Sequence, residues 1–219
     1  MRIGGVDEAG RGPVIGPLVI VAVVISEDML SDLRSIGVRD SKQLTPEQRE
    51  RIFDEIVNVL DDYSVVVVSP QEIDNRSSSL NLLEVEKFAL ALNSLNVKPS
   101  RIYVDSADVD EKRFASLIRA KLNYNAEVIA EHKADAKYEV VAAASILAKV
   151  IRDREIEKLK ERYGDFGSGY PSDPRTRRWL EEYYKEYGEF PPIVRRSWDT
   201  VKRIEAKFGK SQLTLDRFL

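Results

Sequence analysis

The sequence predicts an α/β protein with a mixed sheet of about five strands and helices on its faces. The first observation is that apolar, strand-like runs come early and close together, after which strands alternate with helical segments. The second is the run at residues 18–25 (LVIVAVVI), which is apolar at every position. Such a run is typical of a strand buried on both faces, as the central strands of an α/β sheet are.

The other elements follow along the chain. A helix begins at Pro46, because Thr45 is a suitable N-cap and Gln48 completes a capping box. Further strands are predicted at residues 63–68, 101–105 and 126–130, and further helices at residues 82–95, 111–122 and 136–163. The small side chains of residues 142–145 (AAAS) predict close packing of the last helix on the sheet.

Composition limits the chemistry. The 219 residues fit one large domain, or one domain with a small appendage, and 43% of them are hydrophobic. Since there is no cysteine and only one histidine, His132, disulfides, thiolate zinc sites and cysteine nucleophiles are excluded. No run is long enough to span a membrane and no signal peptide is visible, so we expect a cytoplasmic protein, and nothing demands more than a monomer.

Charge is unevenly distributed. Residues 173–210 contain ten Lys and Arg against seven Asp and Glu, a net charge of +3, so the rest of the chain carries −6 of the total of −3. A basic C-terminal region is compatible with a surface that follows nucleic-acid phosphates. An ordinary solvated helix explains this charge equally well.

Four acidic side chains stand where predicted strands end. Asp7 and Glu8 close the first strand, where adjacent carboxylates serve no packing purpose. Asp105 ends the strand at residues 101–105, and Asp135 follows the strand at residues 126–130. If their strands are neighbours, these acids meet at one edge of the sheet, the usual place for chemistry in α/β folds.

Such a cluster suits two divalent metal ions. If the strands of Asp7 and Asp105 are neighbours, the Cα atoms of these residues lie roughly 5 Å apart. Carboxylates that close repel and raise one another's pKa unless a cation neutralises them. Two metals roughly 3.5–4 Å apart polarise a phosphodiester for attack by water, and carboxylate oxygens favour magnesium or manganese. Simpler explanations stay open: Asp135 as the cap of the next helix, and Asp105 as the start of an Asx-turn with Ser106.

Acids on predicted helices are interpreted differently. They include Glu84, Glu86, Asp153 and Glu155, which sit among basic neighbours. We expect these side chains on solvated helix faces, outside the metal cluster.

Glycines follow the two acids of the first strand. The spacing of Gly10, Gly12 and Gly16 is one residue too long for the dinucleotide-binding signature, and a strand-like run replaces its helix. The better interpretation is that Gly10 and Gly12 let backbone amides approach a ligand closely, while Arg11 contacts a phosphate.

Six segments resemble ribonuclease HII of the archaeal type: DEAGRGPVIGPLV, DSKQL, YVDS, EHKAD, AAASILAKV and GSGYPSDPRT, in this order. The resemblance runs from Arg2 to about Trp198 and implies a ribonuclease H-like mixed five-stranded sheet flanked by helices, with a small helical C-terminal appendage. The expected organisation is a catalytic domain at residues 1–172, a helical basic region at 173–210 and a tail at 211–219. The related ribonuclease HIII carries an extra N-terminal domain, whereas this chain opens directly on the first strand.

The resemblance implies an endoribonuclease that hydrolyses the RNA strand of RNA–DNA hybrids and incises at ribonucleotides embedded in duplex DNA. Its products carry 3′-hydroxyl and 5′-phosphate ends, a chemistry of DNA replication and ribonucleotide excision repair. Asp7, Glu8, Asp105 and Asp135 match the family's ligands for two Mg²⁺ or Mn²⁺ ions, and Asp7 is expected to bridge them.

The same resemblance assigns substrate contacts. Gly10, Arg11 and Gly12 stand where the family reads the ribose 2′-hydroxyl, which distinguishes RNA from DNA. Tyr170 matches a tyrosine that packs on the sugar at an RNA–DNA junction, although an aromatic residue anchoring its loop is a simpler explanation. The basic candidates near substrate phosphates are Lys42, Lys133, Lys149 and Arg152, and ordinary surface charge explains the last three equally well.

Two other functions are compatible with such a fold. A non-catalytic module that binds hybrids predicts that at least one of the four acids is missing, whereas all are present. A two-metal nuclease specific for DNA is the other, and Tyr170 and the Gly-Arg-Gly turn count against it through the resemblance.

The last ten residues, KSQLTLDRFL, need a separate explanation because a tail is usually polar. Their spacing resembles the sliding-clamp-binding motif of replication and repair proteins. Gln212 would bond at the rim of a pocket that Leu215, Phe218 and Leu219 fill. The motif departs from its commonest form in ending Phe-Leu, and a tail that folds back on the domain is the alternative.

Overall fold

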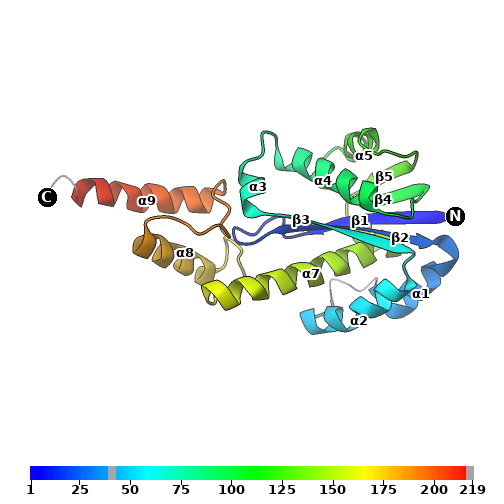
Figure 1. The fold of residues 1–219 in the computed structure, drawn as a ribbon, viewed down its shortest axis with the longest axis horizontal. Coiled ribbons are helices and arrows are strands. Elements are labelled where there is room, and N and C mark those ends of the chain that lie inside the picture. The colour runs from blue at the N-terminus through cyan, green and yellow to red at the C-terminus, as the bar shows by residue number, and fades with distance from the viewer. Residues whose placement is uncertain (39–42, 216–219) are drawn as a thin grey trace. The chain divides into compact units, whose positions relative to one another are not determined.

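Figure 1 shows the fold in a computed structural model of the chain. The structure describes residues 1–38 and 43–215, and of residues 209–215 it describes the backbone alone. The strands are β1 (Arg2–Ala9), β2 (Leu18–Ser26), β3 (Asp62–Val68), β4 (Arg101–Asp105) and β5 (Glu127–Glu131). The helices are the 3-10 helix η1 (Glu27–Met29), α1 (Leu30–Ile36), α2 (Pro46–Val59), α3 (Pro70–Asp74), α4 (Leu80–Ser94), α5 (Glu111–Ala120), α6 (Ala134–Lys137), α7 (Glu139–Tyr163), α8 (Pro174–Tyr187) and α9 (Asp199–Leu215).

The chain divides into two compact units, each built from several segments. The sheet unit consists of Met1–Ala9, Val19–Val67 and Ser77–Asp153. The helical unit consists of Gly10–Leu18, Val68–Arg76 and Arg154–Leu219. Each unit therefore combines parts of the sequence that lie far apart.

The sheet unit contains a mixed sheet in the order β3-β2-β1-β4-β5. β1 pairs with β2 in antiparallel fashion, while β4 is parallel to both β1 and β5. This arrangement confirms the predicted mixed sheet of five strands. Because β1, β4 and β5 run in the same direction, their carboxyl ends point to the same edge of the sheet.

Helices lie on both faces of this sheet, with α4 and α5 on one face and α1, α2 and α7 on the other (Figure 1). Every residue of β2 from Leu18 to Ile25 is buried, as the uninterrupted apolar run predicts. The first turn of α7 packs tightly on β1: a side chain at Gly5 would come within 2.4 Å of the Val140 carbonyl oxygen. The small residues of α7 therefore allow the close packing that the sequence predicts.

The helical unit has a core of its own. Val14, Phe166, Leu180 and Val201 are fully buried in it and come from four separate parts of the unit. The side chain of Asp74, at the end of α3, also accepts hydrogen bonds from the backbone amides of residues 196 and 197, at 2.7 and 2.9 Å. These bonds attach the short helix α3 to the segment that precedes α9.

Two local predictions have different outcomes. The capping box of α2 is present, with Thr45 accepting from the Gln48 amide and Gln48 accepting from the Thr45 amide. A single long helix from residue 136 is wrong, because Tyr138 adopts an extended backbone (φ −119°, ψ 121°) between α6 and α7. The chain therefore makes a short separate helix directly after β5.

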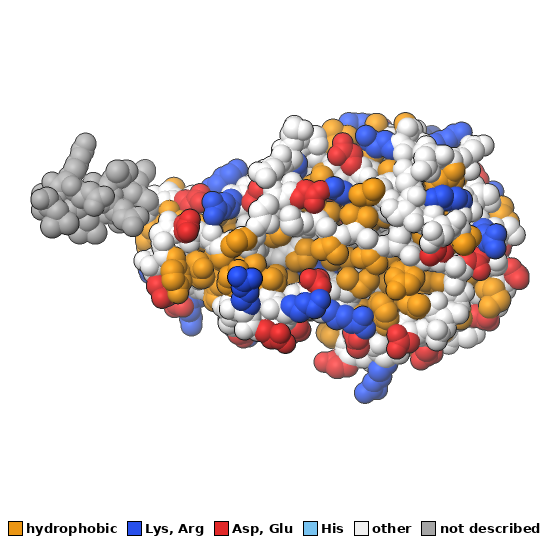
Figure 2. Space-filling view, viewed as in Figure 1, with side chains coloured by type: hydrophobic (Ala, Val, Ile, Leu, Met, Phe, Trp, Pro, Cys, Tyr) orange, Lys and Arg blue, Asp and Glu red, His pale blue; other side chains and the backbone are white. Residues whose placement is uncertain are grey.

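Figure 2 shows acidic and basic side chains interspersed on the visible face. Hydrophobic side chains also reach the surface in the region of β3, where Tyr63, Val65 and Val67 are at least one third exposed. None of the helices in the described part of the chain is both long and apolar enough to cross a membrane.

Candidate active site

Asp7 and Glu8 lie near the carboxyl end of β1, which continues through both acids to Ala9. The parallel register pairs Val6 with Val104, so that Asp7 and Asp105 are the next residues of the two strands. Asp7 is almost completely buried, at 4% exposure. The strand ends therefore bring two carboxylates together, as the sequence predicts.

The environment of Asp7 disfavours its ionised form. Burial raises the pKa of Asp7 to about 7, and the negative charge of Asp105 contributes in the same direction. Smaller opposing effects come from the Ser145 hydroxyl, the Glu8 amide at 2.8 Å and the Lys149 ammonium group. Lys149 also donates to the Ser145 hydroxyl at 2.9 Å, so α7 supplies a linked pair of polar groups to this carboxylate.

The environment of Glu8 also disfavours the ionised form of its carboxyl group. Burial raises its pKa well above the ordinary value, and the charges of Asp7 and Glu84 raise it further. Its Oε2 atom is buried and has no hydrogen-bond partner. A buried carboxylate oxygen without a donor is costly unless another group, such as a bound cation, satisfies it.

Glu84 contradicts the expectation of a solvated helix face. It lies on α4 with no exposed surface, and its charge acts on Glu8. The basic neighbours of Glu84 in the sequence did not indicate its burial, because the side of a helix that faces the sheet is known only once the helix is placed on the sheet. Glu86, Asp153 and Glu155 do have exposed side chains, at 55%, 45% and 35%.

The segment between β5 and α6 bonds to Asp105 and leads directly into Asp135. The Ala134 amide donates a hydrogen bond to Asp105 Oδ1 at 2.8 Å. Asp135 is buried, at 5% exposure, in the first turn of α6, whose N-cap is Lys133. Because the N-cap of α6 is Lys133, the explanation of Asp135 as the cap of that helix is wrong, whereas the Asx-turn of Asp105 stays an alternative.

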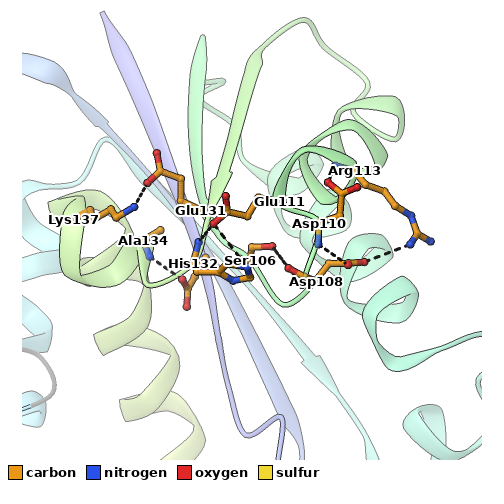
Figure 3. Close-up of polar contacts among 10 residues, drawn as sticks. Ser106, Asp108, Asp110, Glu111, Arg113, Glu131, His132, Ala134 and Lys137 are labelled. Carbon is orange, nitrogen blue, oxygen red and sulfur yellow. Dashed lines mark hydrogen bonds and ion pairs between the residues drawn. The ribbon is translucent and has the colours of Figure 1, made fainter.

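Glu111, at the start of α5, holds the same segment (Figure 3). Its Oε1 accepts a hydrogen bond from the His132 amide at 2.6 Å. The next residue, Lys133, has a left-handed backbone (φ 57°), and no other non-glycine residue in the described part of the chain has a positive φ. Since this conformation is unfavourable for lysine, the contacts on either side of it keep the segment in place.

The acids have the chemistry of a site for hard cations. Asp7, Glu8 and Asp105 are mutually repelling carboxylates, and their oxygens are the ligands that Mg²⁺ and Mn²⁺ prefer. Within residues 1–38 and 43–215, however, no three acidic or histidine side chains lie close enough together to enclose a metal ion. In ligand type, in burial and in the unpartnered Glu8 oxygen, the residues nevertheless fit divalent metal ions.

The Gly-Arg-Gly turn belongs to the helical unit, where it is part of the 10–16 loop, defined as residues 10–16. Gly10 has φ 90°, a conformation that favours glycine. The amides of Val14 and Ile15 both donate to the Gly169 carbonyl oxygen, at 2.8 and 3.3 Å. The loop is therefore attached to the segment GSGYPSDP within this unit.

Tyr170 follows Gly169 and is 44% exposed. Its ring lies beside Gly12, because a side chain at that glycine would come within 3.5 Å of Tyr170 Cε1. Asp173 fixes the turn after Tyr170: it accepts from the Ser168 and Arg175 amides, which lower the pKa of Asp173 to about 2. An exposed aromatic ring is thus presented next to the Gly-Arg-Gly turn.

The remaining predicted residues have mixed outcomes. Arg152 is buried, at 7% exposure, so ordinary surface charge does not explain it. Lys42 lies outside the described residues, as do the side chains of Gln212, Leu215, Phe218 and Leu219. The sequence did not identify Glu84, Glu111 or Arg195 as residues that support the site. For Arg195, the one signal is its place in the segment RRSW shortly after two prolines.

The mixed five-stranded sheet flanked by helices has the ribonuclease H-like architecture that the sequence resemblance implies. Residues 4–201 match the family described as Ribonuclease HII. The ribonuclease HII of Pyrococcus abyssi is 71% identical over all of this chain and 98% of its own length.

Solved structures agree with this match. The crystal structure of ribonuclease H2 from Pyrococcus horikoshii OT3 superposes with a TM-score of 0.94 at 69% identity, covering 96% of this chain and 100% of that one. The ribonuclease HII in the PCNA:RNase HII complex from Archaeoglobus fulgidus superposes with a TM-score of 0.83 at 45% identity, covering 92% and 96%.

The chain belongs to the ribonuclease HII family. It is an endoribonuclease that acts on RNA–DNA hybrids, and ribonucleases of this family need divalent metal ions. The fold and the action on RNA–DNA hybrids that the sequence resemblance implied are confirmed.

Proposed function

We propose that this ribonuclease incises both continuous RNA–DNA hybrids and duplex DNA that contains a single ribonucleotide. Asp7, Glu8, Asp105 and Asp135 would hold two Mg²⁺ or Mn²⁺ ions for this reaction. The observation that carries the proposal is the buried carboxylate group of β1, in which Asp7 and Glu8 have raised pKa values and Glu8 Oε2 has no donor. Such an arrangement is stabilised when cations bind to it.

The bound metals would activate water and neutralise charge on the phosphodiester, leaving a 3′-hydroxyl and a 5′-phosphate. The protein contributes the placement of the ligands. Ser145 and Lys149 on α7 favour the ionised form of Asp7, and the Ala134 amide orients Asp105. Because metals bind carboxylates only when these are ionised, these polar groups help to prepare the site.

Selection of RNA is assigned to the helical unit. The 10–16 loop would read the ribose 2′-hydroxyl through its backbone, a group that both donates and accepts hydrogen bonds. The half-exposed ring of Tyr170, beside Gly12, would pack on the sugar at the junction between RNA and DNA. Lys133, Lys149 and Arg152, together with Lys42, are proposed as phosphate contacts, and residues 173–210 as a basic region that follows the backbone.

A sliding clamp is the proposed protein partner. The structure from Archaeoglobus fulgidus is a complex of a ribonuclease HII with PCNA, which supports this class of partner. In the present chain, Gln212, Leu215, Phe218 and Leu219 have the spacing of a clamp-binding motif. We assign the interaction to this tail.

One assay tests the proposed activity. The purified protein, with Mg²⁺ or Mn²⁺, is given three labelled duplexes: a continuous hybrid, a DNA duplex with one ribonucleotide, and an all-DNA duplex of the same sequence. We expect cleavage of the first two and none of the third. Cleavage of the continuous hybrid alone would contradict the proposed action at embedded ribonucleotides.

A further inference from the structure

Arg195 is the largest side chain with no exposed surface in the described part of the chain, and its guanidinium group bonds to the 10–16 loop. Nε donates to the Gly16 carbonyl oxygen at 3.0 Å, and the two terminal nitrogens donate to the carbonyl oxygens of Arg11 at 3.0 Å and Gly10 at 2.6 Å. One side chain therefore binds both ends of the loop, from about 180 residues away in the sequence.

These bonds also determine where the loop's amides point. Every peptide bond in the described chain is trans, so each carbonyl and the amide N–H of the following residue point in opposite directions. Because the carbonyls of Gly10 and Arg11 point toward Arg195, the N–H groups of Arg11 and Gly12 point away from it. Two successive N–H groups therefore lie on the side of the loop opposite to Arg195.

Trp198 completes the arrangement. Its indole Nε1 donates to the Gly12 carbonyl oxygen at 3.1 Å, and its ring lies 4.9 Å from the Arg195 guanidinium carbon. The backbone of Arg195 takes part as well, since its amide donates to the Val14 carbonyl oxygen at 2.9 Å. The carbonyls of three successive residues, Gly10, Arg11 and Gly12, are thus all fixed by this pair.

We propose that Arg195, supported by Trp198, is the positioning residue that sets discrimination between ribose and deoxyribose. The inference rests on the proposed reading of the 2′-hydroxyl by the 10–16 loop. Neither side chain is assigned a contact with substrate; they act by holding the loop's carbonyls so that its amides present a fixed pattern of donors. Arginine suits this task because its planar group has five donors in a rigid fork, whereas lysine bonds as a compact point charge.

The test uses Arg195→Lys, which keeps the charge but not the fork, and Trp198→Phe, which keeps the ring but not the N–H. Arg196→Lys is the matched control, since it keeps the positive charge of the basic region and the Arg196 side chain donates to the Phe190 carbonyl oxygen instead of the loop. With Ca²⁺ in place of a catalytic metal, fluorescence anisotropy gives each variant's Kd for a duplex with one ribonucleotide and for the all-DNA duplex.

We expect the ratio of the two Kd values to fall at least threefold in Arg195→Lys, less in Trp198→Phe, and not in Arg196→Lys. Hydrogen exchange in residues 10–16 should be faster in Arg195→Lys, whereas calorimetric Mn²⁺ affinity should be unchanged. An unchanged Kd ratio in both Arg195→Lys and Trp198→Phe overturns the proposal. If Arg195→Lys does not fold, the Trp198→Phe ratio decides.

The same data separate this inference from the proposed function. A wild-type protein that binds both duplexes equally would overturn the reading of ribose by the loop, and with it the positioning role. Faster exchange in Arg195→Lys alongside an unchanged Kd ratio would mean that Arg195 stabilises the loop without setting specificity, which also overturns the proposal.

Discussion

Tyr170 is an exposed aromatic side chain on a rigid turn. Asp173 holds the turn through two backbone amides, and the Gly169 carbonyl accepts from the 10–16 loop. The ring itself is 44% exposed beside Gly12, so the turn does not use it as a core residue. This geometry favours a ring that contacts a ligand over one that anchors the loop.

Replacing Tyr170 with Ala should therefore weaken cleavage at a single embedded ribonucleotide roughly tenfold, and cleavage of a continuous hybrid much less. The reason is that a lone ribonucleotide offers one junction sugar, whereas a hybrid offers many equivalent positions. Values of kcat/KM on the two substrates measure the difference, with Tyr187→Ala, another exposed tyrosine of the helical unit, as the control. Equal losses on both substrates would assign Tyr170 to loop structure.

Among the elements, the segment between β5 and α6 shows how neighbouring loops orient the acids. It contains Lys133, whose left-handed backbone is unfavourable for a lysine. On one side of Lys133 the His132 amide donates a hydrogen bond to Glu111, and on the other side the Ala134 amide donates one to Asp105. Asp135 follows directly in α6. Glu111 thus influences two proposed metal ligands without being one of them.

Substitution of Glu111 with Ala should weaken Mn²⁺ binding about tenfold, in the range seen when groups that orient metal ligands are removed. Calorimetric titration measures this, and Glu111→Gln should recover part of the affinity because its amide oxygen still accepts a hydrogen bond. Glu127→Gln, an exposed acid paired with Arg101, serves as the control. Affinity equal to wild type in Glu111→Ala would show that the segment keeps its shape unaided.

The sequence allowed the strand-end acids to be predicted because a parallel register is a local rule applied to recognisable strands. Asp7 and Asp105 follow the paired residues Val6 and Val104. Glu84 and Arg195 were beyond such rules, because their burial depends on how α4 packs on the sheet and on bonds between residues about 180 positions apart. The break between α6 and α7 was also not predicted, because a tyrosine such as Tyr138 does not by itself end a helix.

At the scale of the whole molecule, the buried acids make folding depend on pH. The pKa of Asp7 is raised to about 7 from an ordinary 3.8, and that of Glu8 is raised as well. A raised acid pKa stabilises the fold below the ordinary value, and this contribution is lost as pH rises through about 7. Divalent cations should restore it by neutralising the ionised carboxylates.

In guanidinium denaturation of the metal-free protein, the free energy of unfolding should fall between pH 5 and pH 8. Each pKa unit corresponds to about 1.4 kcal/mol, so the expected loss is a few kcal/mol. Mg²⁺ should stabilise the protein more at pH 8 than at pH 5, and the pH dependence should be shallower in Asp7→Asn. A metal-free stability curve identical in wild type and Asp7→Asn would contradict this electrostatic account.

The tail supplies a prediction at the same scale. Deletion of residues 212–219 should abolish binding to the sliding clamp in calorimetry and leave cleavage of a short duplex within about twofold of wild type. The reason is that the proposed tether contributes no group to the chemistry. Clamp binding that survives the deletion, or a truncated chain that does not fold, would contradict the tether.

In the proposed function, cleavage depends on divalent metals held by the acids around β1. The most direct measurement is a calorimetric Mn²⁺ titration of wild type and Asp7→Asn, each paired with single-turnover cleavage of the duplex with one ribonucleotide. We expect Asp7→Asn to lose most of its Mn²⁺ affinity and at least a thousandfold in cleavage rate while keeping its fold. Wild-type Mn²⁺ affinity and near-normal cleavage in a folded Asp7→Asn protein would contradict the account.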